Sequence, residues 1–132
     1  MDRVLDRLWI GSAEDFRAPL GALGFAGVLD LRDGQTALEV SNVMEYRINQ
    51  RDGTPWTRKQ VLGALEFLAA RIGDGKVLVA CAAGMSRSAC MVIGYLVWTG
   101  WSVAEAYEHV RQVRPKILPV PKMLASELEV VR

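Results

Sequence analysis

The chain is poor in cysteine and histidine, with two cysteines, Cys81 and Cys90, and a single histidine, His109. Two cysteines are too few for the disulfide framework of a small secreted domain. One histidine without a Cys/His cluster leaves no residue spacing typical of a metal site. The sequence therefore predicts neither a disulfide-stapled fold nor a metal centre, and we expect no cofactor.

The sequence also lacks long hydrophobic runs and any large excess of charge. No stretch approaches the roughly 18–20 apolar residues that cross a bilayer, and residues 1–7 carry both charge signs without the apolar core of a signal peptide. The net charge of +1 argues against an extended basic surface for nucleic acid. We expect a cytoplasmic monomer that binds neither membrane nor nucleic acid, with a single domain over residues 1–132.

Strand-like and helix-like segments alternate at first, and helices cluster towards the end. Apolar runs predict strands at residues 4–10, 28–31, 43–48 and 76–81. Helical spacing and capping residues predict helices over residues 12–23 (kinked or shortened by Pro19), 57–72, 87–99, 102–114 and 121–131. Residues 32–42 are expected to form a loop with a short helical turn, and residues 49–55 an exposed loop. This order predicts an α/β fold, in which a mostly parallel central sheet is flanked by helices.

The most informative stretch runs from Val77 to Ser88. An apolar strand ends at Cys81, small residues and one glycine follow, and a helical pattern begins at Arg87. A loop of small residues at a helix N-terminus can turn successive backbone N–H groups inward and bind an anion. Arg87 can hold two phosphate oxygens at once, and this positive field should lower the pKa of the Cys81 thiol. The pattern predicts a thiolate nucleophile that faces a bound phosphate.

The segment Cys81-Ala82-Ala83-Gly84-Met85-Ser86-Arg87-Ser88 resembles the signature loop of the cysteine-dependent protein phosphatases. Its Cys-x-x-Gly-x-x-Arg-Ser form is most similar to the small dual-specificity branch. The segment 8–12 near the start and Arg114-Pro115 with Pro119 near the end resemble other parts of that branch, so the resemblance covers most of the chain. It implies a fold like that of the protein tyrosine phosphatases.

The resemblance also implies a role for each site residue. Cys81 would attack phosphorus, while Arg87 and the backbone N–H groups of residues 82–87 would hold the non-bridging oxygens. An aspartate about 30 residues before the cysteine would protonate the leaving oxygen; Asp52, 29 positions before Cys81 and next to Gly53, fits best. Asp33 and Asp74 are weaker rivals. The expected substrate-binding residues are Ala82, Ala83, Gly84, Met85, Ser86, Arg87 and Ser88, of which Ser88 would also hydrogen-bond the thiolate.

Two positions depart from the family pattern. Ala80 stands where the family usually has a histidine that shapes the loop and tunes the thiol, and Val120 follows Pro119 where an asparagine often braces the loop. We therefore expect weakened rather than abolished activity. Arg114 corresponds to a family arginine that can add a second anion contact, although it could equally be an ordinary cation at a helix C-terminus.

The predicted function is hydrolysis of phosphomonoesters on a phosphorylated protein, at phosphotyrosine and also at phosphoserine or phosphothreonine. The loop offers no lysine, unlike that of phosphoinositide-directed relatives. Two alternatives stay open: a phosphate-binding pseudophosphatase, and a rhodanese-like sulfur carrier that would need Cys81 but no aspartate. Cys90 is expected to be a packing residue, with a reversible disulfide to Cys81 as the alternative, and Trp56 either packs in the core or lines the cleft.

Overall fold

The structure, a computed structural model, describes residues 1–34 and 43–132. The elements in these ranges are β1 (Asp2–Leu5), β2 (Leu8–Ser12), the 3₁₀-helix η1 (Ala13–Arg17), β3 (Phe25–Asp30), β4 (Met44–Arg47), α1 (Arg58–Ile72), β5 (Lys76–Cys81), α2 (Arg87–Trp98), α3 (Val103–Val113) and α4 (Pro121–Val131). Within the described residues the strands form one sheet in the order β1-β2-β5-β3-β4. β5 pairs in parallel with β2 and β3, β3 pairs in parallel with β4, and β1 is antiparallel to β2. The predicted α/β fold with a mostly parallel sheet is confirmed.

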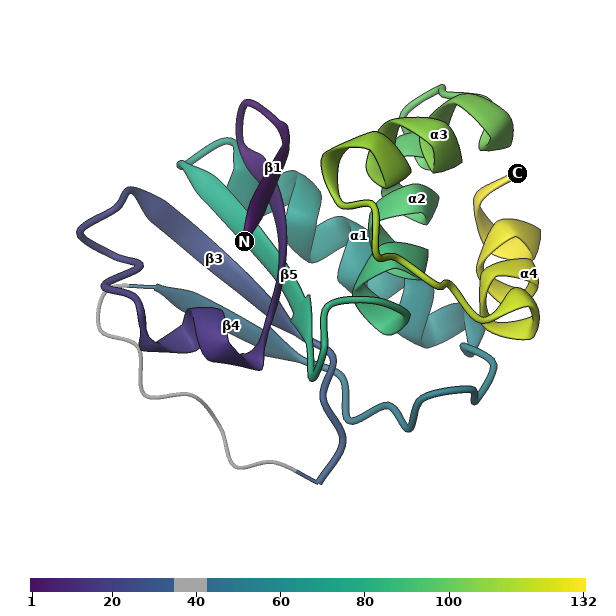
Figure 1. The fold of residues 1–132 in the computed structure, drawn as a ribbon, viewed down its shortest axis with the longest axis horizontal. Helices are drawn as coiled ribbons and strands as arrows, with labels where there is room; N and C mark the ends of the chain where they lie inside the picture. The colour runs from purple at the N-terminus through teal and green to yellow at the C-terminus, as the bar shows by residue number, and fades with distance from the viewer. Residues whose placement is uncertain (35–42) are drawn as a thin grey trace.

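The two faces of the sheet bury different residues, because successive side chains of a strand point to opposite sides. Helices α1 to α4 lie on one side of the sheet (Figure 1), where Ile10, Leu29 and Val79 join the larger core cluster. Val28 and Leu78, whose side chains point to the opposite face, belong to a smaller cluster. That cluster also contains Leu20, which follows η1, and it is packed against by Trp9, which precedes η1. β5 lies at the centre, and because it is buried on both faces its sequence is apolar throughout residues 77–81.

Local signals explain where the helices begin. At the start of α1 the N–H of Gln60 donates to the hydroxyl of Thr57 (3.1 Å) and the N–H of Thr57 donates to the side chain of Gln60 (2.9 Å). Ser102 and Glu105 form the same capping box before α3. The helix predicted over residues 87–99 is α2, and it is buried at every residue from 87 to 96, because apolar side chains lie on nearly all of its faces.

The N-terminal segment differs from its prediction. Residues 4–10 do not form one edge strand: a turn at Asp6-Arg7 separates β1 from β2, and β2 lies inside the sheet between β1 and β5. Ser12 and Asp15 do begin a helix, and the N–H of Ser12 donates to the Asp15 carboxylate (2.9 Å). That helix is only the 3₁₀ turn η1, which ends before Pro19 because proline supplies no N–H to continue it. The predicted turn in residues 32–42 falls mostly outside the described residues.

None of the helices within residues 1–34 and 43–132 is long and apolar enough to cross a membrane.

Candidate active site

The signature loop connects the central strand to the central helix. Cys81 is the last residue of β5, Ser86 is the N-cap of α2, and Arg87 is the first residue of that helix. The neighbouring strands β2 and β3 run parallel to β5, so the loop emerges from the carboxyl edge of the sheet. Ligands of open α/β sheets bind at this edge. The strand, loop and helix N-terminus lie where the sequence predicted them.

Four consecutive carbonyl groups of the loop accept hydrogen bonds from outside it. The donors are the N–H of Ala13 to Ala82 (3.2 Å), Nη2 and Nε of Arg114 to Ala83 (3.5 Å) and Gly84 (2.7 Å), and the N–H of Leu118 to Met85 (2.7 Å). In a planar trans peptide the carbonyl and the following N–H point in opposite directions. The N–H groups of residues 83–86 therefore point away from these donors, to the inner side of the loop, where they form an anion-binding nest.

The thiol of Cys81 lies at the base of this nest. Its Sγ is 3.3 Å from the hydroxyl oxygen of Ser88, and the residue is only 2% exposed. Burial by itself raises the pKa of the thiol, but hydrogen bonds from the hydroxyl and N–H of Ser88 and from the N–H of Gly84, with the positive charge of Arg87, outweigh it. The net effect lowers the pKa of Cys81 below that of an ordinary thiol, which favours the nucleophilic thiolate.

Three acceptors hold the guanidinium of Arg87 at one of its nitrogens. Its Nη1 donates to the carbonyl of Gln50 (2.8 Å), to the carbonyl of Leu31 (3.3 Å) and to the carboxylate of Asp33 (3.2 Å). Its Nε is buried and has no hydrogen-bond partner among the described residues, and the same is true of the Ser86 hydroxyl. A guanidinium fixed on one side with a free buried N–H on the other is ready to bind an oxyanion.

Asp52 lies on the loop between β4 and α1. Its side chain is half exposed, and its Oδ1 is 3.9 Å from Nε of Arg87. The next residue, Gly53, has a φ of +85°, in the left-handed region that favours glycine. α4 holds this loop at two points, because the N–H of Gly53 donates to Sδ of Met123 (3.1 Å) and the N–H of Trp56 donates to the hydroxyl of Ser126 (2.9 Å). Long-range contacts therefore position the loop that carries Asp52.

These groups meet around one small cavity of about 250 Å³. Its lining comprises Asp52, Cys81, Ala82, Ala83, Met85, Ser86, Arg87, Leu118 and Val120. One wall is apolar: Leu118 and Val120 come from the segment between α3 and α4, and Leu118 is 67% exposed although its N–H is bonded to the loop. Sequence reasoning missed this wall, because a leucine in a loop carries no local signal of its position.

The structure separates the remaining candidates. Asp33 lies beside Arg87 despite 54 residues of sequence separation, whereas Asp74 pairs with Arg71 (3.3 Å) in the turn after α1. Trp56 is buried in the main core, as the packing alternative predicted. Cys90 belongs to the same core, and burial raises the pKa of its thiol, with the nearby charge of Glu127 adding to the effect. Cys90 therefore has the environment of a packing residue.

The two departures from the family pattern also have a structural setting. Ala80 is fully buried in the smaller cluster, among residues such as Leu20 and Phe25, and contributes no polar group to the loop. Val120 lines the cavity with an apolar side chain. Arg114, which the sequence left between two roles, is the C-cap residue of α3 and does not line the cavity. It is 5% exposed and its side chain bonds to carbonyls of the loop.

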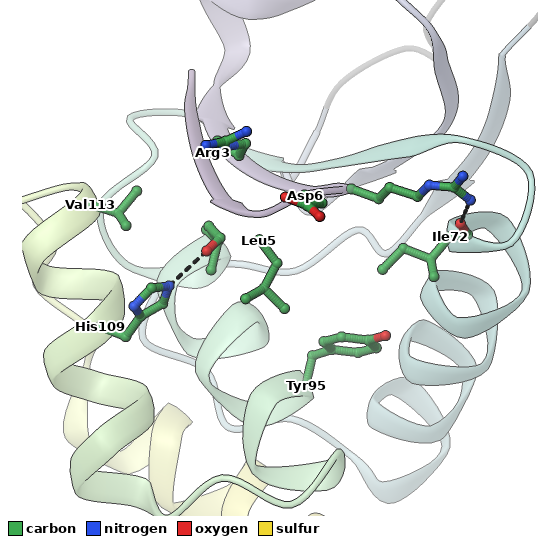
Figure 2. A pocket seen from close by; sticks show the side chains of 9 residues that line it. Arg3, Leu5, Asp6, Ile72, Tyr95, His109 and Val113 are labelled. Atoms are coloured by element: carbon green, nitrogen blue, oxygen red, sulfur yellow. Dashed lines mark hydrogen bonds between the residues drawn. The ribbon is translucent and has the colours of Figure 1, made fainter.

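A wider hollow of about 760 Å³ lies at the other end of β5, under the turn between β1 and β2 (Figure 2). Two of its polar side chains bond to the backbone: Nε2–H of His109 donates to the Val4 carbonyl (2.7 Å), and Nη1 of Arg7 donates to the Ile72 carbonyl (2.9 Å). These bonds tie β1 to α3 and the turn to the end of α1. We regard this hollow as part of the scaffold and take the cavity around Cys81 as the candidate active site.

The comparison with sequence families agrees with this geometry. The family profile described as "Dual specificity phosphatase, catalytic domain" matches residues 8–129. Human dual specificity protein phosphatase 8 is 31% identical over 142 aligned residues, which cover 100% of this chain and 22% of the relative. The chain belongs to the dual-specificity phosphatase family. It spans about a fifth of the length of this curated relative.

Solved structures show the same fold. The crystal structure of human DUSP28 superposes with a TM-score of 0.90 at 25% identity, covering 98% of this chain and 94% of that one. A mouse putative dual specificity phosphatase complexed with zinc tungstate has a TM-score of 0.89 at 26% identity, covering 98% of this chain and 85% of that one. The arrangement of sheet, loop and helices described above is therefore shared with solved phosphatase-family proteins.

Proposed function

We propose that this chain hydrolyses phosphomonoesters on phosphorylated proteins through a cysteinyl-phosphate intermediate. The observation that carries the proposal is that Cys81, Arg87 and Asp52 line one cavity, in which the pKa of the thiol is lowered. A nucleophile, an oxyanion clamp and a carboxyl group are the parts that this reaction requires. The mouse relative bound to zinc tungstate lends support, because tungstate is a tetrahedral oxyanion like phosphate.

In the first step the Cys81 thiolate attacks phosphorus, and the bond between phosphorus and the ester oxygen breaks. The N–H groups of residues 83–86 and the guanidinium of Arg87 hold the three non-bridging oxygens, where charge must be stabilised in the transition state. Asp52, protonated, gives its proton to the departing oxygen, so the product leaves as an alcohol or phenol.

In the second step Asp52, now a carboxylate, takes a proton from water as that water attacks phosphorus. The phosphorus–sulfur bond breaks, and inorganic phosphate and the thiolate are released. The Ser88 hydroxyl, 3.3 Å from Sγ, donates to the departing sulfur and stabilises its charge. The same hydrogen bond lowers the pKa of the resting thiol.

The form of the cavity favours a shallow site. Ala82 and Ala83 are exposed, so the loop lies close to the surface, and the volume of about 250 Å³ suits a phosphate with a short or an aromatic attachment. Phosphoserine and phosphothreonine, as well as phosphotyrosine, are therefore the proposed substrates. The lining contains one basic residue, Arg87, which suits a single phosphate group better than a polyphosphorylated lipid headgroup.

The position of Asp52 separates this proposal from its rivals. A sulfur carrier needs the cysteine and the anion-binding loop but no carboxyl group beside them. A pseudophosphatase needs the anion site without an activated thiol. The lowered pKa of Cys81 and the carboxyl of Asp52 in the same cavity favour hydrolysis over both.

The test is hydrolysis of p-nitrophenyl phosphate by the wild type and by C81S, with acid-quenched protein examined by mass spectrometry. We expect turnover in the wild type, a trapped phosphate adduct on Cys81, and loss of both in C81S. Equal rates for the two proteins would overturn the proposal. Phosphopeptide binding without turnover at any pH would identify a pseudophosphatase, and a stoichiometric persulfide on Cys81 after thiosulfate treatment would identify a sulfur carrier.

A further inference from the structure

Arg114 is a buried cation that does not line the cavity. It is the C-cap residue of α3, only 5% of its surface is exposed, and its Nε donates to the carbonyl of Gly84 over 2.7 Å. A longer contact of 3.5 Å joins its Nη2 to the carbonyl of Ala83. A guanidinium is costly to bury unless its N–H groups are bonded, so these contacts with the loop are part of what keeps Arg114 inside the fold.

Asp2 fixes the orientation of this guanidinium. Nη1 of Arg114 and Oδ2 of Asp2 are 2.6 Å apart, although 112 residues separate them in sequence. The N–H groups of a guanidinium point in fixed directions within one plane. Once Asp2 on β1 holds Nη1, the Nε–H of Arg114 is directed at the Gly84 carbonyl.

The loop is shaped to receive this side chain. Gly84 has a φ of +69°, and a Cβ atom there would lie 2.5 Å from Nη2 of Arg114 and 2.6 Å from the carbonyl oxygen of Gly11. The missing side chain lets the guanidinium approach the loop backbone. Since the carbonyls of Ala83 and Gly84 point towards Arg114, the N–H groups of the next residues, Gly84 and Met85, point towards the anion site.

We infer that Arg114, oriented by Asp2, is the positioning residue that keeps the signature loop in its anion-binding form. Arg114 and Asp2 act on the reaction through the loop, without touching substrate. Their role in catalysis rests on the hydrolysis proposed above. The remaining carbonyls of residues 82–85 are held by backbone donors, from Ala13 and Leu118. Arg114 supplies the side-chain donors, and is therefore the part of this support that a substitution can remove.

The experiment measures the state of the loop without requiring turnover. Alkylation of Cys81 by iodoacetamide is followed as a function of pH, by mass spectrometry of the peptide that contains it, and protection by inorganic phosphate gives the phosphate dissociation constant. The variants are R114M, R114K and D2N. The control is R111M on the same helix, because Arg111 is exposed and pairs with Glu108 (2.6 Å) far from the loop.

In R114M we expect the thiol pKa to rise by about one unit and phosphate to bind roughly tenfold more weakly, because two N–H groups are no longer directed at the anion. D2N should shift both quantities in the same direction by less. R114K, which retains one charged donor, should lie between R114M and the wild type, and R111M should match the wild type. A purely structural role would lower the melting temperature while leaving the alkylation profile and the phosphate affinity of the folded protein unchanged.

Wild-type alkylation and phosphate binding in R114M would overturn the inference. If R114M does not fold, D2N decides, because the Asp2 side chain is 41% exposed and its loss should be tolerated; an unchanged profile in D2N would then reject the inference. Failure of the proposed hydrolysis has a different signature. If the wild-type protein binds phosphate above an ionised Cys81 but shows no turnover, the proposed hydrolysis is rejected. The alkylation profile and phosphate affinity of R114M would still decide the inference about the loop.

Discussion

Nε of Arg87 and Oδ1 of Asp52 lie 3.9 Å apart, within the cavity that contains Cys81. This distance is too long for a hydrogen bond, so Nε of the guanidinium keeps a free donor, and the carboxyl proposed as the general acid lies beside that donor. The relationship leads to the first of four predictions.

Replacing Asp52 by Asn should slow the release of poor leaving groups far more than good ones. We expect a loss of roughly 10²–10⁴-fold on a phosphoserine peptide, whose alkoxide must be protonated as it leaves. On p-nitrophenyl phosphate the loss should be about tenfold or less, since that phenolate leaves without a proton. Steady-state kinetics on both substrates measure the ratio. D74N is the matched control, because Asp74 pairs with Arg71 outside the cavity, and equal losses on the two substrates would remove Asp52 as the acid.

Ser88→Ala should raise the pKa of the Cys81 thiol by about one unit, because it removes the largest of the contributions that lower it. A lowered thiol pKa means that thiolate, and hence activity, rises with pH through the lowered value, so the rising limb of the rate profile should move to higher pH in the variant. The second step should slow as well, and a burst of p-nitrophenol should precede the steady state. Rapid-quench kinetics across a pH series test both effects. An unshifted limb without a burst would contradict the role given to Ser88.

Gly84→Ala should lower the free energy of unfolding by more than the backbone strain at one residue, and it should also weaken phosphate binding. The φ of +69° alone costs about 1 kcal/mol for a residue with a Cβ, and here the Cβ would also meet Arg114 and Gly11 at 2.5 and 2.6 Å. We expect a total loss of about 2–3 kcal/mol in unfolding free energy, and weaker phosphate binding. G100A is the control, because Gly100 has a φ of +118° and nothing lies within 4 Å of the built Cβ. Urea unfolding and phosphate titration should distinguish the two variants.

Glu127 should make the protein less stable as the pH rises. Its side chain is fully buried between α4 and α2, where it occupies the space beside Gly94, and burial raises its pKa well above the ordinary value of 4.5. The unfolded chain therefore releases this proton at a lower pH than the folded chain. The stabilisation is complete below about 4.5 and is lost as the pH rises towards the folded pKa, at up to about 1.4 kcal/mol per unit.

Glu127→Gln should remove this dependence, since the amide has nearly the same shape and does not titrate. Urea unfolding at a series of pH values between about 5 and 8 should give a falling stability for the wild type and a flatter curve for E127Q. E129Q, at an exposed position two residues further along α4, should follow the wild type. Parallel curves for all three proteins would show that Glu127 is not the titrating group.

Much of the fold could be predicted because its signals are local. The bounds of β5, the caps at Thr57 and Ser102, and the buried helix after Arg87 each follow from neighbouring residues, and the structure agrees with them. The turn at Asp6-Arg7 was missed because it contains neither glycine nor proline, so the apolar residues on both sides were taken for one strand.

The residues themselves predict the site only where it is continuous in sequence, and Asp52 could be chosen only because the resemblance supplies a spacing from the cysteine. The loop from Cys81 to Ser88 carries its pattern within eight letters. Asp33 beside Arg87 and Asp2 beside Arg114 depend instead on how distant segments pack, and neither local pattern nor composition contains that information. The same holds for the contacts of Met123 and Ser126 with the loop of Asp52.

The signature loop is held by donors from residues 13, 114 and 118, and the middle one is set by residue 2. The environment of the Cys81 thiol therefore depends on residues that are far apart in sequence, and a chain that lacks residue 114 would lack part of the support of this loop. Chains truncated before residue 114 should accordingly be less sensitive to peroxide at Cys81 than the folded chain, because oxidation of this thiol would require residues 2 and 114 to have come together.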